Sequence, residues 1–450
     1  MKLLTIFGVV LFCGLLLPTQ GHVPGLSCAI SPQAMEKVLS DAMIKNGLLQ
    51  QHLQGLVLPN VMGEGGLLSS PIIITSLHLE AVLQTKLSLA LLPGVGIQLT
   101  IFLRLHLVGN CLIGLLSEII DITVDATVTV NVKNTNFEIG LVQIIVDDCF
   151  CVLGTVKIKL LSGLLPLSVR EIVVGKLTVT LPGLLCPVLD IVINLVNMQL
   201  LATLNVVIPI DVLGTIHYHL ASTPFVTGLY LGIDLDGTVK LADGTIIPHD
   251  SQASTLPPLT DKTLAIGLRQ GFLSVILSVL LRIQPYTFDC TPDTFSGAKL
   301  LAEAIVGLFP PGCSVCSVDT GLSVRVECFG NPLIILEDNK ATVQIILKIQ
   351  VFIKRADGSI LVLLVVKADL ALDVHLSIGK RGLLLALSLG SSSLFLESSE
   401  VGISDISKLN PHLIKLLVEV CLPRLNAAVA IGVPLPDLFG IPLLKADIRI

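Results

Sequence analysis

Three cysteines in one stretch offer the clearest chemistry in this sequence. Cys149 and Cys151 stand at the end of an apolar, strand-like run, and Cys186 follows 37 residues after Cys149 at the start of an apolar run that predicts a helix from Pro187. Two thiols that meet in an oxidising compartment form a disulfide. This arrangement can therefore staple a strand to a helix, and the residues alone leave open which thiol pairs with Cys186.

The other cysteines also favour disulfides. Ten remain after residue 21, an even number. Cys313 and Cys316 form a C-x-x-C motif, which could be redox-active or half of a zinc site. In a secreted chain a structural disulfide or a hairpin cross-link is the simpler interpretation. Cys328 lies twelve residues after Cys316 and could pair with either member of the motif.

Catalytic and metal-binding patterns are weak. His217 and His219 share one face of a predicted strand and could bind a metal, but no third ligand stands nearby, so we interpret them as polar residues on a wet face. Asp147 and Asp148 fit a loop cap at a strand end better than a calcium or acid-base site. The glycines of 63–66 have no following strand–helix unit to hold a phosphate, and the G-x-S-x-G and H-E-x-x-H motifs are absent. The sequence predicts no enzyme, no metal and no cofactor.

Composition narrows the partners. Hydrophobic residues make up 52% of the 450 residues and charged residues 14%, against roughly 25% charged in ordinary proteins. The net charge is −6, and residues 22–225 carry 9 Lys or Arg against 13 Asp or Glu. Neither half is basic, so nucleic acid is not expected as a partner. A chain this apolar either spans a membrane or hides an unusually large apolar surface.

The N-terminus predicts secretion. Lys2 supplies a positive charge, residues 3–17 an apolar core, and residues 19–21 a cleavage site. A signal anchor is the alternative, but the run is shorter than the roughly 20 residues that a bilayer span needs. We expect a signal peptide at 1–21, with cleavage near Gly21 and His22.

Period-two patterns argue against a membrane-spanning body. Residues 191–210 and 87–103 lack charge and raise the possibility of transmembrane helices. However, residues 121–133 and 367–378 alternate strictly between polar and apolar, which indicates strands of about 11–13 residues with one wet and one dry face. A transmembrane barrel would need aromatic girdles, and this chain has no Trp and three Tyr. We expect long soluble strands and no transmembrane span.

Two helices precede the strands, one in each half. In the first, Ser31 fits the N-cap, Pro32 the first position and Gly47 the stop. The second is expected to begin near Thr260 and Asp261. The apolar stripes that these helices should turn inward are Met35, Val38, Leu39 and Ala42 in the first, and Leu264, Leu268, Phe272, Val275, Ile276 and Val279 in the second.

The order helix, strands, helix occurs twice. The first half closes near Cys186 and the second near Cys421, each with a proline just after the cysteine. Residues 247–262 hold three prolines without apolar periodicity and read as a linker. The sequence therefore predicts two similar α+β halves.

Several segments resemble BPI-fold family B, the long PLUNC branch of the superfamily of bactericidal/permeability-increasing protein. They include LLPGVGIQL at 91–99, DITVDATVTV at 121–130, KIKLLSGLLP at 157–166 and LPGLLCPVLDIVINLVN at 181–197. Others are LGTIHYHLASTPFVTGLYLGIDL at 213–235, LAIGLRQGFLSVILSVLL at 264–281, GVPLPDL at 432–438 and KADIRI at 445–450. These segments follow the order of the family along nearly the whole mature chain.

The resemblance implies a boomerang of two tandem domains, each with a twisted antiparallel sheet around a long helix, joined by a central sheet. The domains would be 22–225 and 263–450, with a central strand and linker at 226–262. The resemblance also implies a disulfide between Cys149 and Cys186, and an apolar pocket for acyl chains in each domain. The candidate pocket residues are Met35, Val38, Leu39, Ala42, Phe272, Val275, Ile276 and Val279.

The function implied by the resemblance is binding and not catalysis. We expect a secreted, extracellular protein that holds phospholipid or fatty acyl chains, with a role in mucosal innate defence. Bacterial lipopolysaccharide should bind at most weakly, because family members that bind it tightly present basic tips and the first half here is acidic. The alternative is a structural or interaction component of an extracellular secretion or coat, with vestigial pockets.

Overall fold

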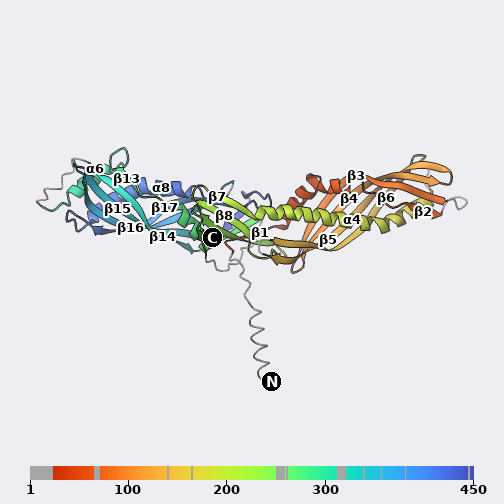
Figure 1. Cartoon of the computed structure of the whole chain (residues 1–450), viewed down its shortest axis with the longest axis horizontal. Coiled ribbons are helices and arrows are strands. Elements are labelled where there is room, and N and C mark those ends of the chain that lie inside the picture. Colours follow the sequence, from red (N-terminus) through yellow and green to blue (C-terminus); the bar gives the residue numbers. More distant parts are fainter. Residues whose placement is uncertain are drawn as a thin grey trace, which may run out of the picture.

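The computed structural model describes residues 24–64, 71–138, 141–163, 166–249, 259, 262–311, 321–337, 340–355, 357–380, 382–443 and 446–449. The expected signal peptide, Cys313, Cys316 and most of the linker lie outside the described residues. The molecule is elongated, with one lobe at each end of the long axis and a central sheet between them (Figure 1). The predicted α+β architecture of two similar halves joined by a central sheet is confirmed.

The central sheet takes strands from the start, the middle and the end of the chain. Its main order is β19-β12-β1-β10-β8-β7, with β9 and β11 paired to β10, and all pairings are antiparallel except that of β12 with β19. The strands are β1 (Leu26–Ile30), β7 (Val206–Ile210), β8 (Gly214–Leu220), β9 (Phe225–Val226), β10 (Leu231–Leu241), β11 (Ile246–Ile247), β12 (Leu264–Leu268) and β19 (Ala446–Arg449). The segment 226–262, where a central strand and a linker were expected, thus contributes β10 and β11, and the other strands of this sheet come from elsewhere in the chain.

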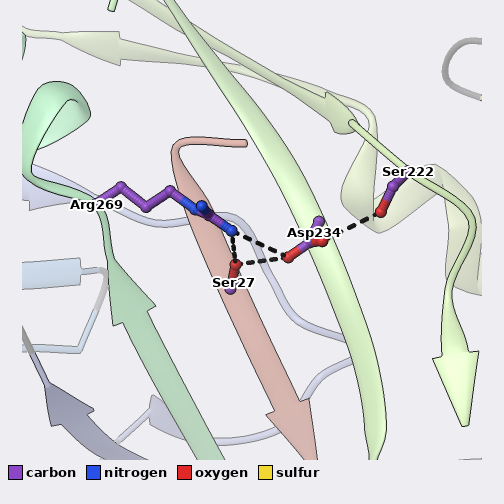
Figure 2. A network of polar contacts seen from close by, with 4 residues as sticks. All are labelled: Ser27, Ser222, Asp234 and Arg269. Carbon is purple, nitrogen blue, oxygen red and sulfur yellow. Dashed lines mark hydrogen bonds and ion pairs between the residues drawn. The ribbon is translucent and has the colours of Figure 1, made fainter. Parts of the chain in front are cut away.

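A polar network crosses the middle of this sheet (Figure 2). Ser27 on β1 donates a hydrogen bond of 2.5 Å to Asp234 on β10, and Ser222 donates to the other carboxylate oxygen at 3.2 Å. Arg269, directly after β12, donates to the Ser27 hydroxyl at 3.1 Å and lies 3.9 Å from Asp234. Because these groups are largely buried, a change in the register of β1 would leave the charge of Asp234 or Arg269 buried without its hydrogen-bonding partner. The network thus favours one register where the two halves meet.

The N-terminal lobe contains a sheet in the order β2-β3-β4-β5-β6. Its strands are β2 (Val61–Glu64), β3 (Pro71–Leu92), β4 (Gly96–Ile113), β5 (Leu116–Glu138) and β6 (Leu141–Leu160). The alternation predicted for 121–133 is confirmed, since the apolar residues from Ile122 to Val130 are fully buried. The strands are longer than predicted because pairing continues past the stretches of strict alternation, with several bulges that absorb the irregular positions.

The helices of this lobe are α2 (Pro32–Ser40), the π-helical turn η1 (Asp41–Lys45), α3 (Leu48–Leu53) and α4 (Leu167–Leu204). The prediction that a helix begins at Pro187 is wrong, because α4 starts twenty residues earlier and contains both Pro182 and Pro187. Each internal proline costs about 3 kcal/mol. Ten buried side chains along α4, nearly all Leu and Val, contribute roughly 1.5–3 kcal/mol each and outweigh that cost.

The C-terminal lobe repeats the plan with a sheet in the order β13-β14-β15-β16-β17-β18. Its strands are β13 (Tyr286–Asp289), β14 (Ser323–Glu337), β15 (Lys340–Lys354), β16 (Ile360–Ile378), β17 (Gly382–Ser398) and β18 (Val433–Pro434). Its helices are α5 (Gln270–Leu280), α6 (Ala298–Val306), the 3-10 turn η2 (Ser407–Leu409), α7 (Asn410–Leu416), the π-helical turn η3 (Leu417–Cys421) and α8 (Leu422–Val429).

The start of the second helix was also predicted wrongly. Leu264 and Leu268 belong to strand β12 and not to a helix, which begins only at Gln270. The segment is extended because it completes the central sheet between β1 and β19, and these pairings override the helix-like spacing of its leucines. In each half a central strand thus leads directly into a helix, β1 into α2 and β12 into α5.

Candidate functional site

An apolar cavity of about 100 Å³ lies at the inner end of the N-terminal lobe, beside the central sheet. Its walls come from α2 with η1, the inner ends of β4 and β5, the last three turns of α4, part of the central sheet, and one residue of the C-terminal segment. The lining residues are Met35, Leu39, Met43, Gly96, Ile97, Leu99, Val132, Ile193, Val196, Asn197, Leu200, Leu201, Leu204, Pro224, Val226, Leu231, Ile233 and Phe439.

The wall formed by α2 and η1 is fixed by local sequence. Ser31 caps the helix, accepting a hydrogen bond of 3.2 Å from the Ala34 amide. Met35, Leu39 and Met43 are spaced four residues apart, so all three lie on the face toward the cavity. The last of them stands in the π-helical turn, a geometry that often occurs at functional sites.

The end of α4 forms the opposite wall. Its lining residues recur every three or four positions, which places them on one helical face. At the edge of the cavity, Gly96 has φ +146°, and a Cβ there would collide with the carbonyl oxygen of Val132. Glycine therefore allows β4 to begin in close contact with β5 at this edge.

The cavity is small for a lipid chain. Apolar cavities of about 150 Å³ are known to bind benzene, and this one is smaller. Two of its lining residues, Met35 and Met43, have flexible unbranched side chains that adapt readily to irregular spaces. A long chain would therefore have to enter by displacing these side chains.

The structure separates the predicted pocket residues of the first half. Met35 and Leu39 line the cavity, whereas Val38 and Ala42 are half-buried against the core and are not among the lining residues. For all of these residues, contact with lipid stays a prediction.

In the second half, the predicted stripe on α5 is buried. Phe272, Val275, Ile276 and Val279 are all at most 9% exposed. The ring of Phe272 lies directly against Gly25 and Gly237 and packs edge-on to Tyr218, with ring centroids 6.2 Å apart. Close contact of this kind is typical of a packed core.

Sequence reasoning missed most of the site, and three of the missed parts show why. Met43 could have been found by extending the four-residue spacing of Met35 and Leu39. The face of α4 could have been found from the apolar residues at 193, 196, 200 and 204, which recur at helical spacing. Phe439 reaches the cavity from the far end of the chain, and no local pattern predicts that contact.

A disulfide joins Cys149 on β6 to Cys186 in the middle of α4, with 5.9 Å between their Cα atoms. This is the pairing that the resemblance implied. Cys151 lies two residues further along β6, unpaired and half-buried, and burial raises the pKa of its thiol. The bond anchors the long helix to the edge strand of its sheet, some way from the turns that line the cavity.

The predicted polar residues form local contacts. His217 lies 3.0 Å from the Thr215 hydroxyl, and His219 lies 3.0 Å from Asp236. His249 approaches the other oxygen of Asp236 at 3.4 Å. Burial alone would raise the pKa of Asp236, but hydrogen bonds from both histidines and Thr238 hold it well below its usual range. Within the described residues, no cluster of three or more candidate ligands could hold a metal.

One described helix, α4, is long and apolar enough to cross a membrane by length and composition alone. In this structure it lies along its own sheet, with its inward side chains buried and a disulfide to β6. Core helices of soluble proteins commonly meet the same criterion. The helix is accordingly explained as the central helix of the lobe.

The molecule has two lobes, each with a sheet of long strands packed on helices, and a shared sheet joins them beside an apolar cavity. This is the two-domain fold of the lipopolysaccharide-binding protein class. The crystal structure of lipopolysaccharide binding protein has this fold, with a TM-score of 0.59 at 17% identity over 93% of this chain and 94% of that one. Residues 39–198 match the N-terminal domain of the LBP / BPI / CETP family, and residues 209–450 match its C-terminal domain. The chain belongs to the LBP / BPI / CETP family.

Relatives within this family carry BPI-fold names. Human BPI fold-containing family B member 4 is 31% identical over 400 residues, which cover 87% of this chain and 64% of that protein. Mouse BPI fold-containing family B member 3 is 30% identical over 388 residues, covering 84% of this chain and 79% of that protein. The resemblance seen in the sequence is therefore confirmed.

Proposed function

We propose that this protein is a secreted lipid-binding protein that holds an acyl chain in the cavity of its N-terminal lobe. The observation that carries the proposal is the cavity itself. It is lined almost wholly by apolar side chains, none of them charged, where α2, α4 and the central sheet meet. Each methylene buried there would contribute about 0.8 kcal/mol. Apolar burial can thus hold a chain without a charged anchor.

Secretion is part of this proposal. The pattern at residues 1–21 fits a signal peptide. The disulfide between Cys149 and Cys186 supports an oxidising destination, because such bonds persist mainly outside the cytosol. The chain is 25% identical over 421 residues to the bactericidal permeability-increasing protein of Sebastes schlegelii, and by this analogy we expect a role in innate defence.

Lipopolysaccharide is a weaker candidate than phospholipid or fatty acid. The solved structure with the same fold is named for lipopolysaccharide binding. That ligand is strongly anionic, whereas residues 22–225 of this chain carry more acidic than basic side chains. Long-range attraction would therefore not favour it.

The test is direct. The secreted protein is purified, extracted with organic solvent, and the extract is quantified by mass spectrometry. An acyl lipid near one mole per mole of protein supports the carrier. A clean extract, together with no uptake of added fatty acid, phospholipid or monoacylglycerol, contradicts it and favours the structural or interaction role.

A further inference from the structure

The cavity has a single polar side chain on its wall. Of the described residues that line it, Asn197 alone carries a polar group, and none carries a charge. Asn197 lies four residues after Ile193 and seven before Leu204, both of which also line the cavity. This spacing puts the amide on the cavity face of α4 and not at its margin.

The amide of Asn197 is available to a ligand. It makes no hydrogen bond among the described residues, whereas the amide of Asn194, one turn away, donates to the backbone oxygen and the carboxylate of Asp190 at 2.9 and 3.1 Å. Asn197 is half-buried, while Ile193 and Val196 beside it are buried. Its amide is therefore in reach of solvent as well as of the apolar residues that line the cavity.

We propose that Asn197 selects the polar group of the bound molecule, and that this group is uncharged. An amide offers both a donor and an acceptor, so it can pair with a hydroxyl or a neutral carbonyl. Among the described residues, no Lys, Arg or His lines the cavity to balance an anion. The ionisable residue on this side of α4 is Asp190, whose carboxylate would repel one. The ligand class is then a chain with one uncharged hydrogen-bonding end, such as a long-chain alcohol or a monoacylglycerol.

This inference rests on the proposed function, since it concerns the polar end of the chain held in that cavity. The experiment compares dodecan-1-ol, dodecane and dodecanoate as competitors of the neutral dye N-phenyl-1-naphthylamine on the intact secreted protein. One hydrogen bond to a half-buried amide should make the alcohol roughly two- to tenfold better than the alkane. The alcohol should also surpass the carboxylate at pH 8.

Three variants assign the effect. Asn197→Leu should remove the preference for alcohol over alkane while the alkane still binds. Asn194→Leu, on the same helix but bonded to Asp190, should keep it. Asn197→Lys should turn the preference toward dodecanoate. Thermal unfolding of each variant confirms that it is folded, and Asn197→Val takes the place of Asn197→Leu if that variant does not fold.

The outcomes are distinct. Equal binding of alcohol and alkane by the wild-type protein, or tighter binding of dodecanoate, overturns the role of Asn197 but leaves chain binding intact. The same holds if Asn194→Leu loses the preference as fully as Asn197→Leu does. If dye and all three competitors fail to bind the wild-type protein, the proposed function itself has failed.

Discussion

The disulfide between Cys149 and Cys186 should be a major source of stability for the N-terminal lobe. It closes a 37-residue separation between β6 and α4. In the chain-entropy treatment, a loop of this length contributes about 4 kcal/mol by restricting the unfolded chain. Replacing both cysteines by serine should therefore lower the free energy of unfolding of this lobe by about that amount, and loosen α4 first because the bond holds the middle of this helix.

Hydrogen exchange measured by mass spectrometry can locate this effect. Peptides from α4 and β6 should exchange faster in the double variant, by up to about three orders of magnitude where exchange requires unfolding of the lobe. Peptides from β15 and β16 in the other lobe serve as the internal control and should change much less. Because α4 also forms a wall of the cavity, binding of the dye should weaken in parallel.

Two results would refute this reasoning. Unchanged exchange in α4 would show that packing alone holds the helix, and an equal loss in both lobes would show that the bond stabilises the whole molecule and not one lobe. Non-reducing peptide mapping must also find Cys149 bonded to Cys186 in the wild-type protein. A bond between Cys151 and Cys186 would retain the staple but contradict the pairing.

Three further predictions follow from the sequence and the cavity. N-terminal sequencing of the secreted protein should begin within a few residues of His22, and an intact Met1 in a membrane fraction would show that the segment is an anchor. Leu39→Phe should fill the cavity and weaken dye binding at least tenfold. Ala42→Phe, which lies outside the lining, and charge reversal of Lys157 and Lys159 should have little effect on dye binding at low or high salt. Loss of binding only on charge reversal would indicate an electrostatic site. Asp236→Asn should destabilise the protein at pH 7. The folded state holds the pKa of this carboxyl below its usual range, so the ionised carboxylate stabilises the fold at every pH above the unfolded pKa of about 3.9. That gain disappears as pH falls from about 4 through the folded pKa, so the difference from wild type in urea unfolding should shrink toward pH 2, and a constant difference would show that packing and not charge is responsible.

Much of the architecture could be read from local patterns. Strict alternation in 121–133 identified a strand with one buried face because side chains in a strand point to opposite sides in turn. Ser31 and Pro32 marked the start of α2 because the first turn of a helix needs an acceptor and tolerates a missing donor. Both patterns depend only on residues within one helical turn or one strand, so distant parts of the chain do not change what they predict.

Errors arose where distant parts of the chain decided the outcome. The proline at 187 suggests a helix start, yet the long sheet of the lobe buries enough of α4 to carry the helix through it. The leucines of 264–268 have helical spacing, yet their backbone pairs with two neighbouring strands, β1 and the C-terminal strand β19. In both cases, long-range packing and pairing outweighed local propensity.

The sequence by itself determined that this chain has two similar halves of long strands and helices, an excess of apolar side chains, and the face that α2 turns inward. Only the tertiary structure decided where a cavity remains. Met35 and Leu39 meet the end of α4 and Phe439 across space that the packed elements leave unfilled. By contrast, Phe272 on the equivalent helix lies tightly against Gly25, just before β1, and Gly237 in β10. Periodicity shows which side chains point inward, but whether they fill the interior depends on the shapes of partners hundreds of residues away.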